Sequence, residues 1–281
     1  MLRASDPRPF GRYQLIVHMK KTGVLLLVIA LAVACAKVPI TGRSQMNLLP
    51  ESQLMGMSLT AYQDFLKENP AMPATDQRVQ MVKRIGDKLA AAATKYCNEN
   101  GASDRVAGFQ WEFNVVEDPT VNAWCMPGGK VVVYTGILPI TQDEAGLAVV
   151  MGHEIAHAIA RHGNERMSQG VAIQGAGIGL SVLLSEKPQW TQDLFLQSYG
   201  IGSQLGMLAY SRNHESEADK MGLIFMAMCG YDPRVAPKFW ERMSANGGAA
   251  PPELLSTHPS DARRIADLEA YMPKALEHYK P

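Results

Sequence analysis

Two histidines and a glutamate lie close together at His153–His157, a segment with the pattern H-E-x-x-H. Four residues turn a helix through about 400°, so the two imidazoles would lie on one face, one turn apart. Imidazoles at that spacing can share one zinc ion, and Glu154 beside them is placed to act as a general base. The alternative is two surface histidines on an amphipathic helix, but Val149 and Val150 make the neighbourhood apolar. The motif therefore indicates a metal site.

A zinc ion in a hydrolytic site takes three protein ligands and keeps one position open for water, so a third ligand is needed. His162 is nearby, but nine residues after His153 it would point to the opposite face of one continuous helix. We interpret it as a surface histidine. Glu215 is the better candidate, because Asp219 follows it by one turn and can accept an N–H bond from a ligating histidine. Glu217 would point elsewhere, as exposed charged residues on helices commonly do.

The residue types in this site bear on its role. Structural zinc sites usually close with four cysteine or histidine ligands, whereas this one offers two histidines, a glutamate and an adjacent base. That set favours hydrolytic catalysis, in which zinc polarises a carbonyl group and lowers the pKa of its bound water toward about 7. A chaperone or binding module with a non-catalytic zinc site is the alternative function.

Two helices must position these side chains. Thr141 and Glu144 have the spacing of a capping box, which predicts a helix that starts there, carries both histidines and runs to about Ser168. A second helix is expected at Ser211–Met228, where Gly230 supplies the stop signal just beyond its end. The site would then form where the two helices meet.

Hydrophobic periodicity predicts the elements around them. Helices are expected at Leu54–Leu66 and Val79–Ala93, and a last amphipathic helix passes through Leu268. The segment Phe109–Val115 alternates apolar and polar residues like a strand, and Val131–Tyr134 is a second β-rich run. The predicted fold class is α+β, mainly helical, with a small β-sheet beside the H-E-x-x-H helix.

Two apolar stretches, Val171–Leu184 and Leu194–Leu208, lie between the ligand-bearing helices in the sequence. The first is rich in glycine and, at 14 residues, is too short to cross a membrane. Three interpretations stay open: a lid over the site, a surface that leans on the membrane, or ordinary packed core.

The segment Ser211–Asp219 reads S-R-x-x-E-x-E-A-D and follows H-E-x-x-H by about sixty residues. Together these motifs resemble those of the HtpX and CAAX-prenyl-protease family of gluzincin metallopeptidases, especially its soluble periplasmic members, over the peptidase domain only. The transmembrane helices of the integral members have no counterpart here, which points to the lipid-anchored branch. The resemblance runs from about Leu48 to Tyr271 and includes Asn122-Ala123, Gly128-Gly129 and Thr257-His258-Pro259.

The resemblance implies a gluzincin domain that binds one zinc ion and acts as a metalloendopeptidase on extended or misfolded envelope proteins. It carries over the zinc ligands His153, His157 and Glu215. It also carries over Glu154 as general base, and Asp219 as the partner of a ligand histidine.

Four further positions take roles by resemblance. Asn122 and Ala123 would lie on an edge strand, where an extended peptide gains main-chain hydrogen bonds with little demand on its sequence. His258 and Arg264 are candidates to stabilise the oxyanion. Two alternatives stay open for His258: a fourth zinc ligand in a resting state, or a residue that only begins a helix before Pro259.

The N-terminus has the form of a targeting signal. Two lysines precede the apolar run Val24–Ala34, which is typical of a secretion signal, and we interpret Met19 as the true start. Leu31–Cys35 resembles a bacterial lipobox, so a lipid on Cys35 is expected to hold the domain on the periplasmic face of the bacterial outer membrane. The alternative is an ordinary signal cut nearby, with Cys35 a bystander thiol.

This interpretation divides the 281 residues into a leader at 1–34, a lipidated tether at 35–50 and one metallopeptidase domain at 51–281. Basic and acidic residues number 27 each, and the leader holds five of the basic ones but a single acidic one, so the remainder is mildly acidic. That balance argues against a nucleic-acid partner. Secretion would permit disulfides among Cys97, Cys125 and Cys229, but the pairing and the oligomeric state stay open.

Overall fold

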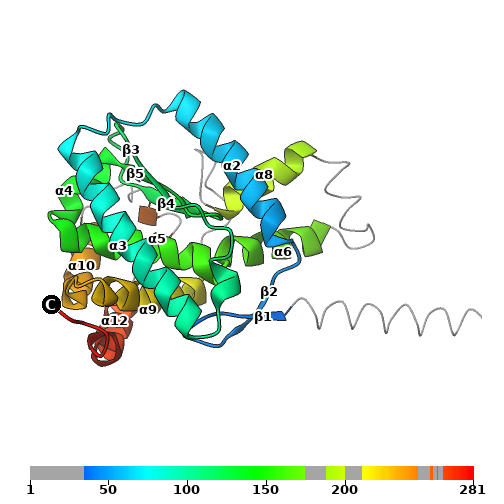
Figure 1. Ribbon diagram of the computed structural model, residues 1–281. Helices are drawn as coiled ribbons and strands as arrows, with labels where there is room; N and C mark the ends of the chain where they lie inside the picture. The colour runs from blue at the N-terminus through cyan, green and yellow to red at the C-terminus, as the bar shows by residue number, and fades with distance from the viewer. Residues whose placement is uncertain (1–34, 175–187, 200–210, 246–253, 256–257, 259–261) are drawn as a thin grey trace, which may run out of the picture.

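The computed structural model describes residues 35–174, 188–199, 211–245, 254–255, 258 and 262–281. Helices predominate among them, and a small sheet lies beside the helix α5 (Figure 1), which confirms the predicted fold class. The strands are β1 Cys35–Lys37, β2 Ser44–Met46, β3 Glu112–Val116, β4 Ala123–Met126 and β5 Lys130–Tyr134. The helices are α2 Glu51–Glu68, α3 Gln77–Glu99, α4 Leu138–Thr141, α5 Glu144–Ala160, α6 His162–Gln174, α8 Pro188–Ser198, α9 Arg212–Met228, α10 Ala236–Ala245 and α12 Ala262–Leu276.

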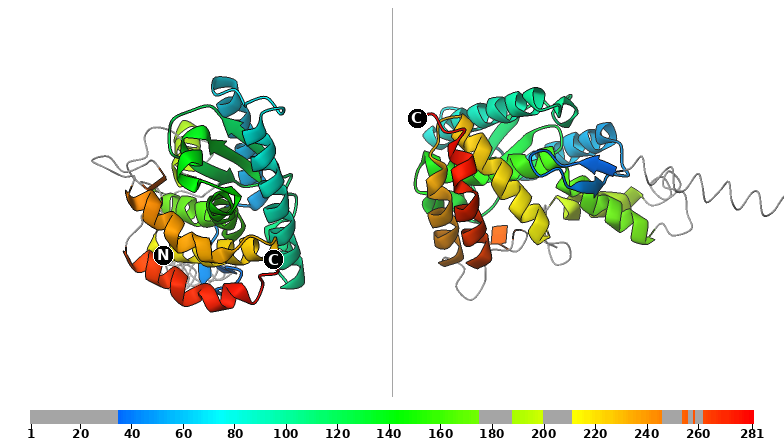
Figure 2. Two further views of the ribbon diagram at one scale, coloured as in Figure 1. Left: turned by 90° about the vertical axis from the view of Figure 1, so that its left-hand side faces the viewer. Right: turned by 90° about the horizontal axis from the view of Figure 1, so that it is seen from below.

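The three-stranded sheet has the order β3-β5-β4. β3 runs parallel to β5, whereas β4 pairs with β5 antiparallel and places Ala123 opposite Val133. The tight turn before β5 uses Gly128 and Gly129, whose φ angles of 83° and 82° lie in the region that favours glycine. β4 is therefore an edge of this sheet, and it packs beside α5 (Figure 2).

The start of α5 differs from the prediction. Its N-cap is Asp143, whose carboxylate accepts a hydrogen bond from the Gly146 N–H at 2.8 Å. The predicted capping box of Thr141 and Glu144 is wrong, because Thr141 is the last residue of α4 and its hydroxyl donates to a carbonyl within that helix. Gln142, with a φ of 68°, then redirects the chain before α5 begins.

The end of α5 also differs from the prediction. The expected continuous helix to about Ser168 is wrong, since α5 ends at Ala160 and α6 begins at His162. Arg161 between them has left-handed backbone angles, with φ at 59° and ψ at 35°. A single left-handed residue redirects the chain, so the side chains of α6 no longer follow the helical register of α5.

α9 crosses α5 at very short range because both helices carry glycine at the crossing. A Cβ atom on Gly152 would lie 3.2 Å from the Gly222 carbonyl oxygen, and one on Gly222 would lie 3.0 Å from the His153 nitrogen. The first turn of α9, which begins after the N-cap Ser211, also lies against the histidine face of α5, where Glu215 contacts His153 and His157. α12 covers α9 from the outer side (Figure 2).

A short N-terminal hairpin, β1–β2, covers one end of α6. Cys35 is opposite Met46 in the pair, and just beyond it the Leu48 N–H donates to the Ser168 hydroxyl at 2.8 Å. The stretch that the sequence assigns to a tether thus contacts the helical body. Cys97, Cys125 and Cys229 are free thiols in this fold.

Some predictions fall wholly or partly outside the described residues. These are the leader at 1–34, Thr257 and Pro259, and parts of the two apolar stretches, at 175–184 and 200–208. Among the helices that the structure describes, none combines the length and the apolar character needed to cross a membrane.

Candidate metal centre

Four buried side chains converge between α5 and α9. His153 and His157 come from α5, Glu215 comes from the first turn of α9, and His258 comes from the chain before α12. One ligand atom from each side chain lies within 4.8 Å of all the others, and each residue is at most 4% exposed. The structure therefore brings together the two predicted histidines and the predicted glutamate, and adds His258 to them.

The separations fit a single zinc ion. Bonds of about 2.0–2.1 Å in a tetrahedral arrangement place ligand atoms roughly 3.3 Å apart. His157 Nε2 lies 3.0 Å from His153 Nε2 and 3.4 Å from Glu215 Oε1, and His153 Nε2 lies 3.3 Å from Glu215 Oε2. His258 Nδ1 lies 3.0 Å from Glu215 Oε1 and 3.2 Å from His153 Nε2. Two imidazoles, a carboxylate and a further imidazole are also the donor types that zinc prefers.

The charge states of His157 and Glu215 suit ligation. Burial lowers the pKa of His157 well below its ordinary value, so its ring is neutral and offers a lone pair. Burial alone would raise the pKa of Glu215, but His258, His153 and His157 outweigh it and hold that pKa well below its ordinary value. The glutamate is therefore a carboxylate that faces imidazole nitrogens.

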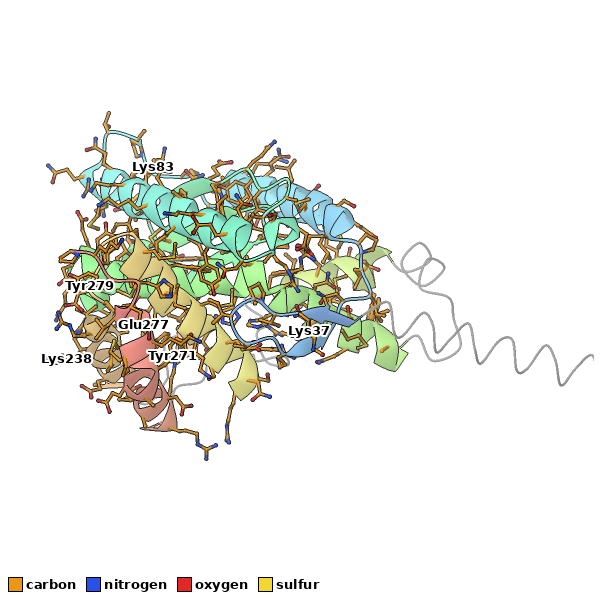
Figure 3. All side chains as sticks on the ribbon, turned by 60° about the horizontal axis from the view of Figure 1, so that its bottom comes forward. Lys37, Lys83, Lys238, Tyr271, Glu277 and Tyr279 are labelled. Atoms are coloured by element: carbon orange, nitrogen blue, oxygen red, sulfur yellow. The ribbon has the colours of Figure 1, made fainter. Side chains whose placement is uncertain are left out.

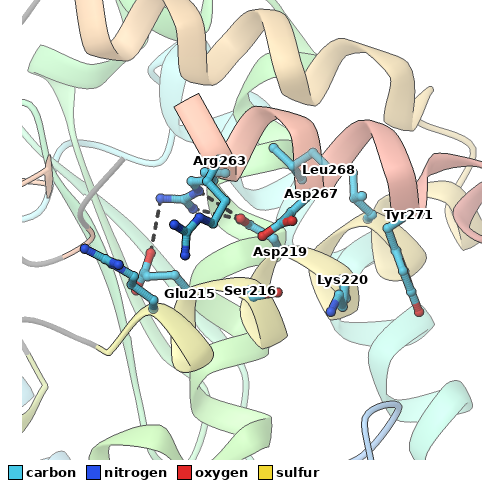
Figure 4. Close-up of a pocket in the computed structure, with 11 residues that line it drawn as sticks. Glu215, Ser216, Asp219, Lys220, Arg263, Asp267, Leu268 and Tyr271 are labelled. Carbon is cyan, nitrogen blue, oxygen red and sulfur yellow. Dashed lines mark hydrogen bonds and ion pairs between the residues drawn. The ribbon is translucent and has the colours of Figure 1, made fainter. Parts of the chain in front are cut away.

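Asp219 lies one turn beyond Glu215, as predicted, and contacts the other ring nitrogen of His153, with Oδ1 2.9 Å from Nδ1. Arg264 bridges the two acids. Its Nε and Nη2 donate to Asp219 at 2.8 and 2.7 Å, and its Nη1 lies 3.1 Å from Glu215 Oε2 (Figure 4). The guanidinium also stacks on Trp240, with 3.3 Å from Cζ to the ring centroid. Arg264 thus fixes both acids relative to α12.

Glu154 is buried on the other side of the histidine pair, at 3% exposure. Its Oε1 lies 3.5 Å from His258 Nε2 and has no hydrogen-bond partner among the described residues. Burial, offset in part by His258 and Arg264, raises the pKa of Glu154 to about 7. A carboxyl group with such a pKa can both take up and release a proton near neutral pH.

The predicted substrate strand is present, and its main chain is partly engaged. Asn122 is buried just before β4, and its side-chain oxygen accepts a hydrogen bond from the Ala123 N–H at 2.9 Å. The Leu254 N–H donates to the Val121 carbonyl at 3.2 Å, so the segment before His258 reaches the start of this edge.

His162 and Glu217 are buried neighbours of the metal centre that sequence reasoning missed. His162 is fully buried, and its Nδ1 lies 2.9 Å from His157 Nδ1, so its interpretation as a surface histidine is wrong. Glu217 is also buried, and its Oε2 lies 3.0 Å from His162 Nε2, so the expectation that it faces solvent is wrong as well. The position of His162 was predicted by counting helical turns from His153, and this fails because the left-handed Arg161 ends α5 before His162.

A signal for Glu217 was present in the sequence. Most of the second half of α9, from Met221 to Met228, is apolar without helical periodicity, which is typical of a helix buried on all sides. An acid on such a helix needs an internal partner.

Comparison with known proteins decides the family. The sequence model described as peptidase family M48 matches residues 76–272, most of the chain. The chain belongs to peptidase family M48. Membership confirms the predicted family resemblance, the predicted enzyme class of zinc metalloendopeptidase and zinc as the metal of this centre.

Individual relatives in this family include proteins from eukaryotes and bacteria. The mitochondrial metalloendopeptidase OMA1 of Schizosaccharomyces pombe is 35% identical over 85% of this chain and 66% of its own. The human metalloendopeptidase OMA1, mitochondrial, is 32% identical over 95% of this chain and 51% of its own. The β-barrel assembly-enhancing protease of Escherichia coli is 30% identical over 56% of this chain and 33% of its own. This chain thus spans about two thirds or less of each relative.

The relatives correct the predicted location. Several are named as mitochondrial, whereas the leader and Cys35 had predicted the periplasmic face of a bacterial outer membrane. These names contradict the predicted location, which is therefore wrong. The physical reason is that a basic leader poor in acidic residues is shared by secretion signals and mitochondrial transit peptides.

Proposed function

We propose that this M48 peptidase cleaves internal peptide bonds of protein substrates at a zinc ion held by His153, His157 and Glu215. The observation that carries the proposal is the convergence of the three side chains: the two Nε2 atoms lie 3.0 Å apart, and the two carboxylate oxygens of Glu215 lie 3.3 Å from His153 Nε2 and 3.4 Å from His157 Nε2. Zinc bound there would lower the pKa of a water molecule and polarise the scissile carbonyl group.

Glu154 is the proposed general base. Its carboxylate takes a proton from the attacking water and later returns it to the leaving amine. Its burial and its pKa of about 7 support both transfers, because the proton is held neither too tightly nor too weakly near neutral pH. Asp219 fixes the His153 ring through the contact at Nδ1, which leaves Nε2 for the metal.

His258 and Arg264 have different surroundings, which support different roles. His258 Nε2 lies 3.5 Å from Oε1 of the proposed base Glu154, while its Nδ1 lies among the ligand atoms. We therefore propose oxyanion stabilisation for His258 with substrate bound, and a fourth ligand position in the resting state. Arg264 is engaged with Asp219 and Glu215, which supports a positioning role more than direct contact with the oxyanion.

The proposed substrate is an extended or misfolded polypeptide that adds to the β4 edge near Asn122 and Ala123. Because such pairing uses main-chain hydrogen bonds, it selects for extended conformation more than for sequence. The Leu254 N–H, which now occupies the Val121 carbonyl, would have to leave before a substrate strand pairs there.

The test is Glu154→Gln. This variant should bind zinc as the wild type does and keep the fold, yet lose cleavage of casein by at least about 100-fold, the usual contribution of a general base. Glu117→Gln, at a side chain that is 76% exposed, is the matched control and should cleave normally. Undiminished cleavage by Glu154→Gln would refute the assignment.

A second candidate function is a chaperone or binding module with a non-catalytic zinc site. The specific observation in its favour is His258, because it completes a set of four ligands and structural zinc sites are four-coordinate. Casein cleavage that a chelator abolishes and zinc restores would exclude this alternative, whereas absence of any cleavage by the zinc-loaded chain would support it.

Membrane attachment through a lipid on Cys35 is a separate proposal. It depends on the lipobox-like sequence Leu31–Cys35 alone. Intact-protein mass spectrometry of the wild type and of Cys35→Ser would reveal the added mass of acyl chains, and equal masses apart from the substitution would contradict it.

A further inference from the structure

The N-terminal hairpin places one charged side chain between two helices. Arg43 lies in the connection between β1 and β2 of this hairpin, and β2 contacts α6; Figure 3 labels Lys37 at the end of β1. Arg43 Nη1 and Nη2 donate to the two carboxylate oxygens of Glu165 on α6, at 2.8 and 2.7 Å. Its Nε lies 2.9 Å from both oxygens of Glu217 on α9. A planar guanidinium with two carboxylates in this arrangement is rigid, because each acid is bound by a fixed fork of donors.

Glu217 carries this contact inward. Its Oε1 accepts a hydrogen bond from the Thr41 hydroxyl at 2.6 Å, and its Oε2 lies 3.0 Å from His162 Nε2. His162 Nδ1 in turn lies 2.9 Å from His157 Nδ1. An unbroken series of side-chain contacts therefore runs from the hairpin to a residue of the metal centre.

The hydrogen positions along this series follow from the metal. His157 directs Nε2 toward His153 and Glu215, so a metal bound there takes the Nε2 lone pair and leaves the hydrogen on Nδ1. That N–H donates to His162 Nδ1, which must then be the acceptor. The hydrogen of His162 lies on Nε2 and donates to Glu217. A single arrangement of hydrogens thus satisfies all three residues, and the carboxylate at its outer end selects it.

We propose that His162, Glu217 and Arg43 position His157 for metal binding, so that the N-terminal hairpin contributes to the zinc affinity of the enzyme. This inference rests on the proposed role of His157 as a ligand. It gives each ligand histidine its own partner: Asp219 orients His153, and His162 orients His157. The contacts that orient His153 come from α9, whereas those that orient His157 continue through His162 and Glu217 to Arg43 in the N-terminal hairpin.

The experiment measures the zinc Kd of the full chain by chelator competition, together with the visible absorption spectrum of the cobalt-substituted protein. Removing a partner of a ligand histidine typically weakens metal binding about 10- to 100-fold. We expect His162→Ala to raise the Kd within that range and to shift the cobalt bands, because the ring of His157 loses its orientation. His162→Asn should restore much of both, since its side-chain oxygen can accept from His157 Nδ1.

Arg43→Met tests the outer end of the series. It should raise the zinc Kd toward the lower end of the same range. The matched control is Arg105→Met, since Arg105 donates to Gln45 and to the Lys37 carbonyl and so holds the same hairpin without touching Glu217. If Arg105→Met weakens zinc binding as much as Arg43→Met, the hairpin acts by general packing and the role of Arg43 is overturned.

Two further outcomes separate this inference from the proposed function. Wild-type Kd and cobalt spectrum in His162→Ala, with zinc binding lost in His157→Ala, would overturn the positioning role and leave the ligand assignment intact. Wild-type zinc binding in His157→Ala would overturn the ligand assignment itself. Circular dichroism of each apo variant checks folding, and if His162→Ala does not fold, Arg43→Met decides: a wild-type Kd and cobalt spectrum in that variant overturn the proposal.

Discussion

Two buried clusters of acids and histidines lie within a few residues of each other, and they differ in kind. The metal centre consists of His153, His157, Glu215 and His258. The second, which we call the Arg43 cluster, consists of Arg43, His162, Glu165, His214 and Glu217. Both draw on α9 and on the histidine-rich chain of α5 and α6, and both bury their carboxylates almost completely.

The difference lies in what faces the carboxylates. In the Arg43 cluster a guanidinium binds both glutamates through paired hydrogen bonds, so the two carboxylates share one cation within the protein. In the metal centre, Arg264 divides its contacts between Asp219 and Glu215, and Glu215 Oε1 is directed at imidazole nitrogens. Among the described residues, only the metal centre gathers its ligand atoms within 4.8 Å of one another. Residue type alone therefore does not identify a metal site, whereas convergence of lone pairs does.

The largest expected effect separates the two clusters directly. Glu215→Ala should weaken zinc binding by more than about 100-fold, beyond the range typical of outer partners, and should abolish casein cleavage. Glu165→Ala removes an equally buried glutamate from the Arg43 cluster and should retain measurable zinc binding. Titration with a chromophoric chelator distinguishes them. Equal losses in both variants would contradict the distinction between the clusters.

The stability of the apo protein should depend more on the Arg43 cluster. Arg43→Met leaves two buried carboxylates without their cation, which typically costs about 3–5 kcal/mol. Since the Arg43 side chain is 27% exposed, we expect the lower end, about 3 kcal/mol. Urea unfolding in the presence of a chelator measures this loss. Arg234→Met, at a side chain that is 62% exposed, is the control and should change stability by less than about 0.5 kcal/mol.

Zinc should stabilise the fold through the metal centre alone. At a free zinc concentration of about 100 times Kd, binding to the native state adds about 2.7 kcal/mol to the unfolding free energy. His153→Ala should lose this gain, whereas His214→Ala in the Arg43 cluster should keep most of it. Thermal melts with and without zinc test both variants, and a full zinc gain in His153→Ala would show that the metal binds elsewhere.

The smallest expected effect is on acid stability. Burial would raise the pKa of Glu165, but hydrogen bonds from Arg43 and His214 outweigh it and hold the pKa well below its ordinary 4.5. A carboxyl group whose pKa is lowered in the folded state stabilises the fold at pH values above its ordinary pKa. This stabilisation is lost as the pH falls from the ordinary pKa toward the lowered one. Unfolding free energy should therefore decline below about pH 4.5, and less steeply in Glu165→Gln. Urea unfolding of the wild type and of Glu165→Gln from pH 7 to pH 3 measures this difference. An identical pH dependence of the unfolding free energy in both proteins would show that Glu165 is not responsible.

Local sequence was sufficient for much of the metal centre. Within one helix the spacing of His153 and His157 fixes that both rings share a face, and the spacing of Glu215 and Asp219 does the same on α9. Periodicity also predicted the helices α2, α3 and α12 and the strands β3 and β5, whereas the edge strand at Asn122 and Ala123 was expected from the family resemblance. These predictions hold because they depend on neighbours within a few residues.

What the tertiary structure alone decided is how separate segments meet. Arg161 adopts a left-handed conformation that the helical pattern does not predict. Because of this break, His162 contacts His157 instead of lying on the surface. Arg43 reaches Glu217 across 174 residues of sequence, and the glycines of α5 and α9 set how closely Glu215 approaches the histidines. Periodicity fixes direction only within one regular element. Beyond a break or a helix crossing, packing and charge pairing determine the direction of each side chain.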